Sequence, residues 1–154
     1  MASVHHYRAE VSWAGSTGVG YDHYSRAHSL CCPPAGQELL LSGDRAFGGD
    51  PERLNPEQLL LAAASSCQLL SFLAVCARAR IDVASYSDSA SAEMPEDDRP
   101  VRITRILLRP RIVIAGEAHE ERLPRLIDLA HRECYVANSL GSEITIEAEI
   151  SIQP

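Results

Sequence analysis

The feature that most constrains the fold is a long apolar stretch without any charged residue, from Leu59 to Ala77. Just before it, Asn55 is a favoured helix N-cap, and Pro56 suits the first helical position because its φ is fixed and it has no N–H. Glu57 adds negative charge near the positive end of the helix dipole. Residues 54–83 therefore predict one long helix, and the rest of the chain is expected to pack around it.

The length of this predicted helix approaches that of a membrane span. Its middle carries polar side chains, however, and a helix that is apolar all round is also typical of the central helix of a soluble protein. These polar residues are Ser65, Ser66, Gln68 and Ser71. We therefore expect a soluble protein with no membrane partner.

A chain of 154 residues is long enough to bury a real core, and we expect a single domain over residues 1–154. Its formal charge is -7 and it contains no lysine, which argues against nucleic acid as a partner. Residues 1–10 lack the apolar core of a secretory signal, so a cytoplasmic location is expected. The five cysteines should then be mostly reduced thiols.

The number and spacing of the cysteines argue against a disulfide framework and against a zinc site of the CxxC type. His23, His28, Cys31 and Cys32 lie close together in the sequence, but they match no familiar metal-ligand spacing. We expect no metal. Cys31 and Cys32 are interpreted as incidental, or as additional oxidisable thiols if they are exposed.

Hydrophobic periodicity predicts the remaining elements. Strands are expected over residues 5–13, 21–30, 38–42, 85–94, 101–115 and 142–152, the fifth bent or bulged at Pro110. The second of these strands would point Arg26 toward one face of the sheet. An amphipathic helix is expected over residues 120–133, with a short helix after it. This order predicts an α+β fold in which a largely antiparallel sheet packs on the long central helix.

Two cysteines stand out as candidates for chemistry. Cys67 lies in the middle of the predicted central helix among small residues, which would let another element approach its sulfur closely. Taken alone, it is interpreted first as a buried packing cysteine, since free cysteine is among the most buried residue types. Cys134 lies at the end of the second helix, where charges and the helix end can tune a thiol.

These two stretches resemble the OsmC/Ohr family, the osmotically inducible protein C and organic hydroperoxide resistance proteins. The resemblance covers nearly the whole chain in element order, and the residues that carry it are Asn55, Pro56, Glu57, Gln58, Leu59, Ala63, Cys67, Cys134, Asn138 and Ser139. It implies an intertwined α+β homodimer with active sites at the dimer interface. It also implies a cysteine-based peroxidase of the stress response that reduces organic hydroperoxides, uses an external dithiol as reductant and needs no cofactor.

The resemblance also implies roles for individual residues. Cys67 would react with the peroxide and Cys134 would resolve the product. A catalytic arginine of the family lies on the early strands, and Arg26 is the best-placed counterpart, with Arg45 and Arg53 remaining open as alternatives. The family counterpart of Glu57 orients this arginine.

Two positions depart from the classical organic-hydroperoxide branch of the family. Tyr135 stands where that branch has a proline after the second cysteine, and Gln68 stands where it commonly has a phenylalanine after the first. The residues therefore do not assign the chain to the OsmC or the Ohr branch.

The chemistry imposes geometry that can be checked. A disulfide requires Cα atoms within roughly 7 Å, so the end of the second helix must dock onto the middle of the first. Glu57 precedes Cys67 by ten residues, which places it about 15 Å away along a helix axis and turns it roughly 80°. We therefore predict that Glu57 serves a site across the dimer interface. The alternative is a carboxylate that only stabilises the helix dipole.

Other interpretations remain at this point. Cys76 lies half a revolution from Cys67 and is expected in the core. His131 is either a residue that activates Cys134 or an exposed helix histidine. The main alternative function is that of a non-catalytic stress-response or binding protein, which keeps this fold and binds a small apolar ligand. A cysteine hydrolase is a more distant alternative.

Overall fold

The computed structural model describes residues 2–116 and 120–153. The chain divides into two compact units, Met1–Leu59 and Leu60–Pro154. The long helix α1 (Pro56–Arg78) begins at the end of the first unit and continues in the second.

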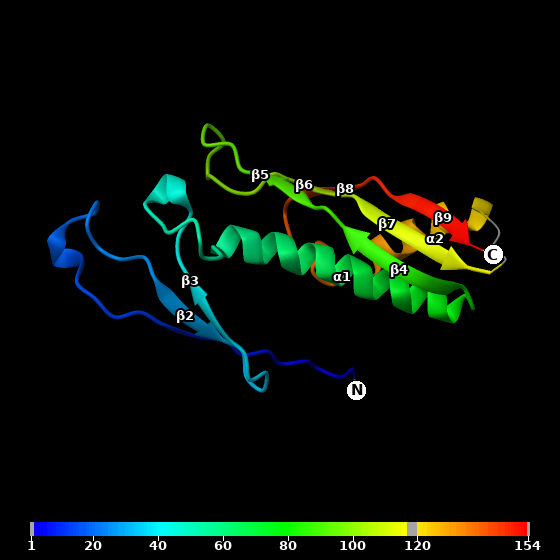
Figure 1. Ribbon diagram of the computed structural model, residues 1–154, viewed down its shortest axis with the longest axis horizontal. Helices are drawn as coiled ribbons and strands as arrows, with labels where there is room; N and C mark the ends of the chain where they lie inside the picture. Colours follow the sequence, from blue (N-terminus) through cyan, green and yellow to red (C-terminus); the bar gives the residue numbers. More distant parts are fainter. Residues whose placement is uncertain (1, 117–119, 154) are drawn as a thin grey trace. The chain divides into compact units, whose positions relative to one another are not determined.

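The first unit contains a small antiparallel sheet with the order β1-β2-β3 (Figure 1). Its strands are β1 (Glu10–Ser12), β2 (His28–Cys31) and β3 (Glu38–Leu41), and short 3-10 turns lie at η1 (Thr17–Val19) and η2 (Arg45–Phe47). The strand predicted over residues 38–42 is confirmed. The strands predicted over residues 5–13 and 21–30 are much shorter than expected, because only their last residues join the ladder.

The prediction that Arg26 lies on a strand is wrong, since Arg26 precedes β2. Its guanidinium donates hydrogen bonds to the backbone carbonyls of Tyr21 and Tyr24, at 2.7 Å and 2.8 Å. These carbonyls therefore bond to a side chain and not to a neighbouring strand. Alternation in the sequence does not reveal this competition.

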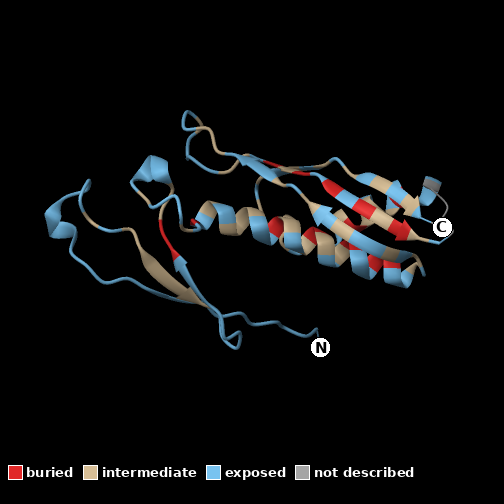
Figure 2. Cartoon of the chain, in the orientation of Figure 1, coloured by how far each residue is buried: buried red, intermediate tan, exposed pale blue. Residues whose placement is uncertain are grey.

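The first unit has almost no core of its own. Among its described residues only Leu41, Ser42 and Asn55 are buried, and Figure 2 shows most of the unit as exposed. A three-stranded sheet of this size needs a covered apolar face to be stable, so the unit depends on contacts beyond itself.

The predicted start of α1 is confirmed by a reciprocal capping box. The side chain of Asn55 accepts a hydrogen bond from the Gln58 N–H at 2.8 Å, and the Gln58 side chain accepts one from the Asn55 N–H at 3.0 Å. The Asn55 amide also donates to Asp44 at 3.1 Å, which ties the cap to the loop after β3. The helix ends before Arg80, which has a positive φ of 58°.

The second unit contains two three-stranded sheets and a second helix. One sheet has the order β4-β7-β9 and the other β5-β6-β8. The strands are β4 (Asp82–Asp88), β5 (Ser91–Glu93), β6 (Arg105–Leu108), β7 (Pro110–Ala115), β8 (Glu143–Ile146) and β9 (Glu149–Gln153). The helical segments after β7 are η3 (Glu120–Arg122), α2 (Leu123–Arg132) and η4 (Ala137–Ser139). The predicted amphipathic helix and the short helix after it are therefore present.

The two sheets of this unit share one register across a local break. Arg105 pairs with Glu143 before the break and Arg111 with Glu149 after it, so paired residues keep the same offset of 38 positions. The buried side chains also keep their alternation through the break, at Ile106, Leu108, Pro110, Ile112 and Ile114. The interruption predicted near Pro110 is thus confirmed, at Arg109.

Two hydrogen bonds to the Asp88 carboxylate stabilise the chain at this break. The carboxylate accepts the Arg109 N–H at 2.7 Å and the hydroxyl of Ser65, on α1, at 2.5 Å. On the other side of Arg109, the Glu147 N–H donates to the Leu108 carbonyl at 2.9 Å. The prediction of one uninterrupted strand over residues 142–152 is wrong, because the chain breaks between β8 and β9, next to the break at Arg109. The alternation of isoleucines in this segment is unaffected by the break, so the sequence pattern does not report it.

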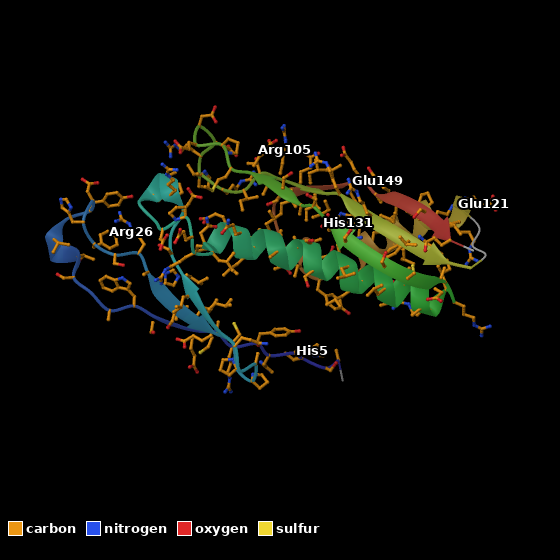
Figure 3. The ribbon with its side chains drawn as sticks, in the orientation of Figure 1. His5, Arg26, Arg105, Glu121, His131 and Glu149 are labelled. Carbon is orange, nitrogen blue, oxygen red and sulfur yellow. The ribbon has the colours of Figure 1, made fainter. Side chains whose placement is uncertain are left out.

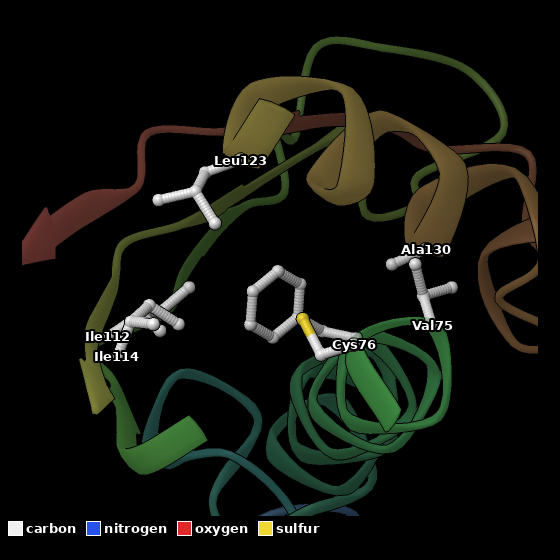
Figure 4. Close-up of a cluster of buried hydrophobic side chains, with 7 residues drawn as sticks. Val75, Cys76, Ile112, Ile114, Leu123 and Ala130 are labelled. Carbon is white, nitrogen blue, oxygen red and sulfur yellow. The ribbon is translucent and has the colours of Figure 1, made fainter. Parts of the chain in front are cut away.

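The core of the second unit lies between the helices and the inner face of the strands. One cluster joins α1, β7 and α2 (Figure 4), and its buried members are Phe72, Val75, Cys76, Ile112, Ile114, Leu123 and Ala130. A second cluster packs Ala64 of α1 against Ile106 and Leu108 of β6. Cys76 is buried as expected. By length and composition α1 could also cross a membrane, but a core helix passes the same test.

The predicted α+β class is confirmed, with one long helix packed on sheets whose pairing is largely antiparallel. Four of the six strand pairs in the described residues are antiparallel, and only β6-β8 and β7-β9 are parallel.

Replacing Asp88 by alanine should destabilise the protein, because the change removes the shared acceptor of the Ser65 hydroxyl and the Arg109 N–H. We expect the free energy of unfolding to fall by about 1–3 kcal/mol, as when a partly buried group loses its partner. Urea denaturation measures this, with Asp128→Ala on the exposed face of α2 as the control. Equal, small effects of the two changes would show that the Asp88 contacts contribute little.

Candidate active site

Cys67 lies near the centre of α1 and is half-buried. The residues before it are small, Ala62, Ala63, Ala64, Ser65 and Ser66, so the backbone of another segment can come close to its sulfur. That segment is the turn after α2. The N–H of Val136 donates to Cys67 Sγ at 3.5 Å.

Cys134 lies in the same turn and is only 1% exposed. Its N–H donates to the carbonyl of His131 at 3.2 Å, which continues the last turn of α2, and its sulfur accepts the N–H of Ala137 at 3.5 Å. The α2 helix is held by its apolar face in the core, so this turn is fixed against α1.

The structure brings Cys67 and Cys134 together. The N–H of Val136, two residues after Cys134, reaches Cys67 Sγ, Cys67 raises the pKa of the Cys134 thiol, and both are free cysteines. The docking that a disulfide between them requires, the end of α2 against the middle of α1, is therefore present in the reduced protein.

Burial raises the pKa of the Cys134 thiol to about 11, and the neighbouring Cys67 adds to this rise. The N–H groups of Ala137 and Val136 act in the opposite direction, because they stabilise a thiolate. Cys134 is consequently a protonated thiol at neutral pH. The two thiols thus differ in access, since Cys67 is half-buried and Cys134 is enclosed.

Arg26 belongs to the first unit and lies against the loop that follows β3 (Figure 3). Its guanidinium stacks on the rings of Tyr21 and Tyr24, with the central carbon 4.8 Å and 4.0 Å from the ring centroids. A Cβ at Gly48 would come within 2.9 Å of this carbon, so the absence of a side chain at Gly48 makes room for the guanidinium. Its buried Nε has no hydrogen-bond partner among the described residues.

Glu57 lies in the first turn of α1 and is half-buried. Its Oε2 is buried and accepts no hydrogen bond from the part of the chain that the structure describes. This oxygen is therefore not solvated, as in a purely helix-stabilising residue, and it has no partner among the described residues.

The two alternative arginines differ from Arg26. Arg53 forms an ion pair with Asp50 at 3.3 Å, and Arg45 is an exposed residue of η2. Of the three arginines, Arg26 has the most extensive set of contacts.

The described residues contain no group of three or more His, Cys, Asp or Glu side chains placed to hold a metal ion. His28 instead bonds through Nδ1 to the Arg26 carbonyl at 2.8 Å, and the Cys31 thiol donates to Glu10 at 3.8 Å. Cys32 is the exposed member of the adjacent pair.

Two residues near the cysteines were missed by the sequence analysis. Gln68 is 2% exposed, and Tyr86 of β4 packs its ring 6.0 Å from that of Phe72. Burial raises the pKa of Tyr86, with smaller contributions from Asp88 and Cys134. A polar residue within the apolar run was the available signal for Gln68. No local pattern indicated Tyr86.

Raising the pH should weaken the contribution of Cys134 to stability. Its folded pKa of about 11 exceeds the ordinary value of 9.0, so the stabilisation is complete below pH 9 and is lost as the pH rises through 11. The loss attributable to Cys134 is at most about 3 kcal/mol. Under reducing conditions, the difference in unfolding free energy between the wild type and Cys134→Ala should shrink over this interval. A difference that is independent of pH would contradict the raised pKa.

Comparison with known proteins identifies relatives of the whole chain. The family model described as OsmC-like protein matches residues 49–149. An OsmC-like protein of unknown function from Vibrio cholerae is 29% identical with a TM-score of 0.84, and the alignment covers 96% of this chain and 100% of that one. An organic hydroperoxide resistance protein from Elizabethkingia anophelis, solved with thiocyanate bound, is 19% identical with a TM-score of 0.73 over 99% and 100% of the two chains.

Among curated proteins, the uncharacterized protein YmaD of Bacillus subtilis is 19% identical over 97% of this chain and 95% of its own length. The family match includes Glu57, Cys67 and Cys134 but begins after Arg26. It spans most of the chain, and the solved structures share the fold along nearly its full length. The chain therefore belongs to the OsmC-like protein family.

Proposed function

We propose that this protein is a thiol-dependent peroxidase that reduces organic hydroperoxides through Cys67 and Cys134. The observation that carries the proposal is the meeting of these two free thiols, 67 residues apart in the sequence, between α1 and the turn after α2. Structural neighbours described as organic hydroperoxide resistance proteins support the choice of substrate class.

The accessible thiol acts first. The Cys67 thiolate attacks the outer oxygen of the hydroperoxide, the O–O bond breaks, and the alcohol leaves after taking up a proton. Cys67 becomes a sulfenic acid. The Val136 N–H that points at Cys67 Sγ supports the thiolate, because a hydrogen bond to the charged form favours it.

Cys134 then resolves the intermediate. Its sulfur forms a bond to Cys67 Sγ, the S–O bond breaks, and the leaving hydroxide recovers a proton and departs as water. The enclosed position of Cys134 suits this role, since an external peroxide has little access to it. An external dithiol reduces the disulfide and restores both thiols, which fits a reducing, cytoplasmic compartment.

Arg26 and Glu57 are proposed to complete the site. Each carries a buried polar atom without a partner among the described residues, Nε in Arg26 and Oε2 in Glu57. A guanidinium near Cys67 would favour its thiolate, and a carboxylate would orient the guanidinium. We assign these roles across the interface of a homodimer, because helix geometry keeps Glu57 away from Cys67 of its own chain.

Exposed apolar surface supports the homodimer. Between Leu59 and Ala77 the outer face of α1 carries no charge, and its exposed members there are Ala62, Ala63, Ser66, Leu70, Leu73, Ala74 and Ala77. Leu70 is 63% exposed, and the first unit leaves many of its large apolar side chains exposed as well. Surfaces of this kind mark protein contacts. A second copy of the chain is the partner that the family resemblance favours.

The proposed peroxidase activity is tested by following the loss of cumene hydroperoxide in the presence of a dithiol. Peroxide loss should be catalytic in the wild type and should fall to the uncatalysed rate in Cys67→Ser, which removes the attacking thiolate. Cys134→Ser should lose turnover with the dithiol but still form one sulfenic acid. The control is Cys32→Ser, which removes an exposed thiol and should keep full activity. A wild type that consumes no peroxide would instead favour a non-catalytic protein that binds a small apolar ligand.

The homodimer is tested by sedimentation equilibrium. The wild type should sediment at twice the chain mass of 16.8 kDa. Leu70→Arg places a charge on the outer face of α1 and should shift the mass toward one chain, because burying an unpaired charge is costly. Val101→Arg, which charges another exposed apolar position, is the control. A wild type that sediments as a single chain at micromolar concentration would exclude the proposed interface.

A further inference from the structure

Three buried polar atoms of the second unit have no hydrogen-bond partner among the described residues. They are Gln68 Oε1, Tyr86 Oη and His131 Nδ1. Protein interiors leave few such atoms unsatisfied, and each one calls for a physical reason. Gln68 is the most deeply buried of the three residues, at 2% exposure.

The contacts between α1 and β4 locate Gln68 and Tyr86. On α1, Gln68 shares a face with Ser65, three residues before it, and with Phe72, four residues after it. Ser65 bonds to Asp88 at 2.5 Å, and the ring of Phe72 lies 6.0 Å from that of Tyr86. Tyr86 and Asp88 are two residues apart and point to the same side of β4. Gln68 therefore projects between these two contacts, beside Tyr86.

Cys134 lies on a third side of the buried region beside Gln68 and Tyr86. Tyr86 packs against the cluster that contains Phe72 and Ala130, and Cys134 follows Ala130 by four residues, so the thiol continues the face of α2 that packs toward Tyr86; the Cys134 side chain is 1% exposed. The enclosed polar groups are thus a phenol, an amide and a thiol, and they belong to three different segments of the chain. We call this space, bounded by Gln68, Tyr86 and Cys134, the internal polar site.

We propose that the internal polar site binds one ordered water molecule. The Tyr86 hydroxyl and the Gln68 amide hold this water, and the water accepts a hydrogen bond from the Cys134 thiol. A buried water needs two to four polar partners, and these three groups meet that number. The water makes Tyr86 and Gln68 positioning residues, because they act on the chemistry only through Cys134.

This role rests on the proposed peroxidase function. When Cys134 attacks the sulfenic acid of Cys67, its S–H bond breaks, an S–S bond forms and the S–O bond of Cys67 breaks. The bound water takes the proton from Cys134 and passes one of its own to the hydroxide that leaves Cys67, which departs as water. Atoms and charge balance with no reactant beyond the peroxide. The step that should depend on Tyr86 and Gln68 is therefore disulfide formation, and not the attack on peroxide.

The proposal is tested with Tyr86→Phe, which keeps the ring against Phe72 and removes only the hydroxyl, and with Gln68→Leu, which removes the amide. Tyr135→Phe removes a hydroxyl from a tyrosine that is 82% exposed and is the matched control. After one equivalent of peroxide, dimedone trapping measures sulfenic acid on Cys67, and intact mass follows the disulfide. We expect disulfide formation to slow at least tenfold in both variants, with sulfenic acid formation changed less than twofold. Disulfide formation at the wild-type rate in Tyr86→Phe would overturn the proposal.

A crystal structure of the reduced protein tests the site without relying on peroxidase activity. It should show a water within 3.5 Å of both Tyr86 Oη and the Gln68 side chain, and the water should be lost in the Tyr86→Phe, Gln68→Leu double variant. A well-ordered structure with no water there would overturn the internal polar site. If the wild type forms no sulfenic acid while the water is present, the peroxidase proposal fails and the water site stands.

Discussion

The contact between the turn after α2 and the middle of α1 is the interaction on which the candidate site depends. The N–H of Val136 reaches Cys67 Sγ, and Val136 itself packs against the cluster formed by Ala64, Ile106 and Leu108. Apolar packing thus holds a backbone donor at a sulfur atom. Because alanines and serines surround Cys67 on α1, the turn can approach closely, and a larger side chain at Ala64 would separate the two segments.

The same packing makes the two cysteines unequal. Cys134 lies in the core side of the turn, where burial holds it as a thiol, whereas Cys67 keeps partial access from outside. A pair of chemically identical side chains thereby differs in exposure to solvent through its surroundings alone. Asp88 adds a polar tie between α1 and the sheet near this level, since it accepts hydrogen bonds from Ser65 and Arg109 together. The helix that carries Cys67 is consequently held on two sides, by the turn and by β4.

The absence of charged residues on α1 between Leu59 and Ala77 has two consequences. One face fills the core through Phe72, Val75 and Cys76, and the opposite face stays exposed in a single chain. The first unit, with three buried residues among those described, is equally short of apolar contacts. Both features are explained if a second chain covers these surfaces. The Arg26 Nε and Glu57 Oε2 atoms fit the same account, since neither has a hydrogen-bond partner among the residues that the structure describes.

The sequence by itself determined the elements whose signals are local. The Asn55 cap, the apolar run after it and the amphipathic α2 all depend on neighbouring residues, so periodicity and capping chemistry were sufficient, and the α+β class followed. The family motifs likewise pointed to Cys67 and Cys134. Tertiary structure decided what depends on distant partners. Arg26 left the predicted strand because its guanidinium bonds to the Tyr21 and Tyr24 carbonyls, and the strand over residues 142–152 broke beside Arg109. Tyr86 joined the surroundings of Cys134 only through packing, because contacts between residues far apart in the chain leave no periodic trace in it.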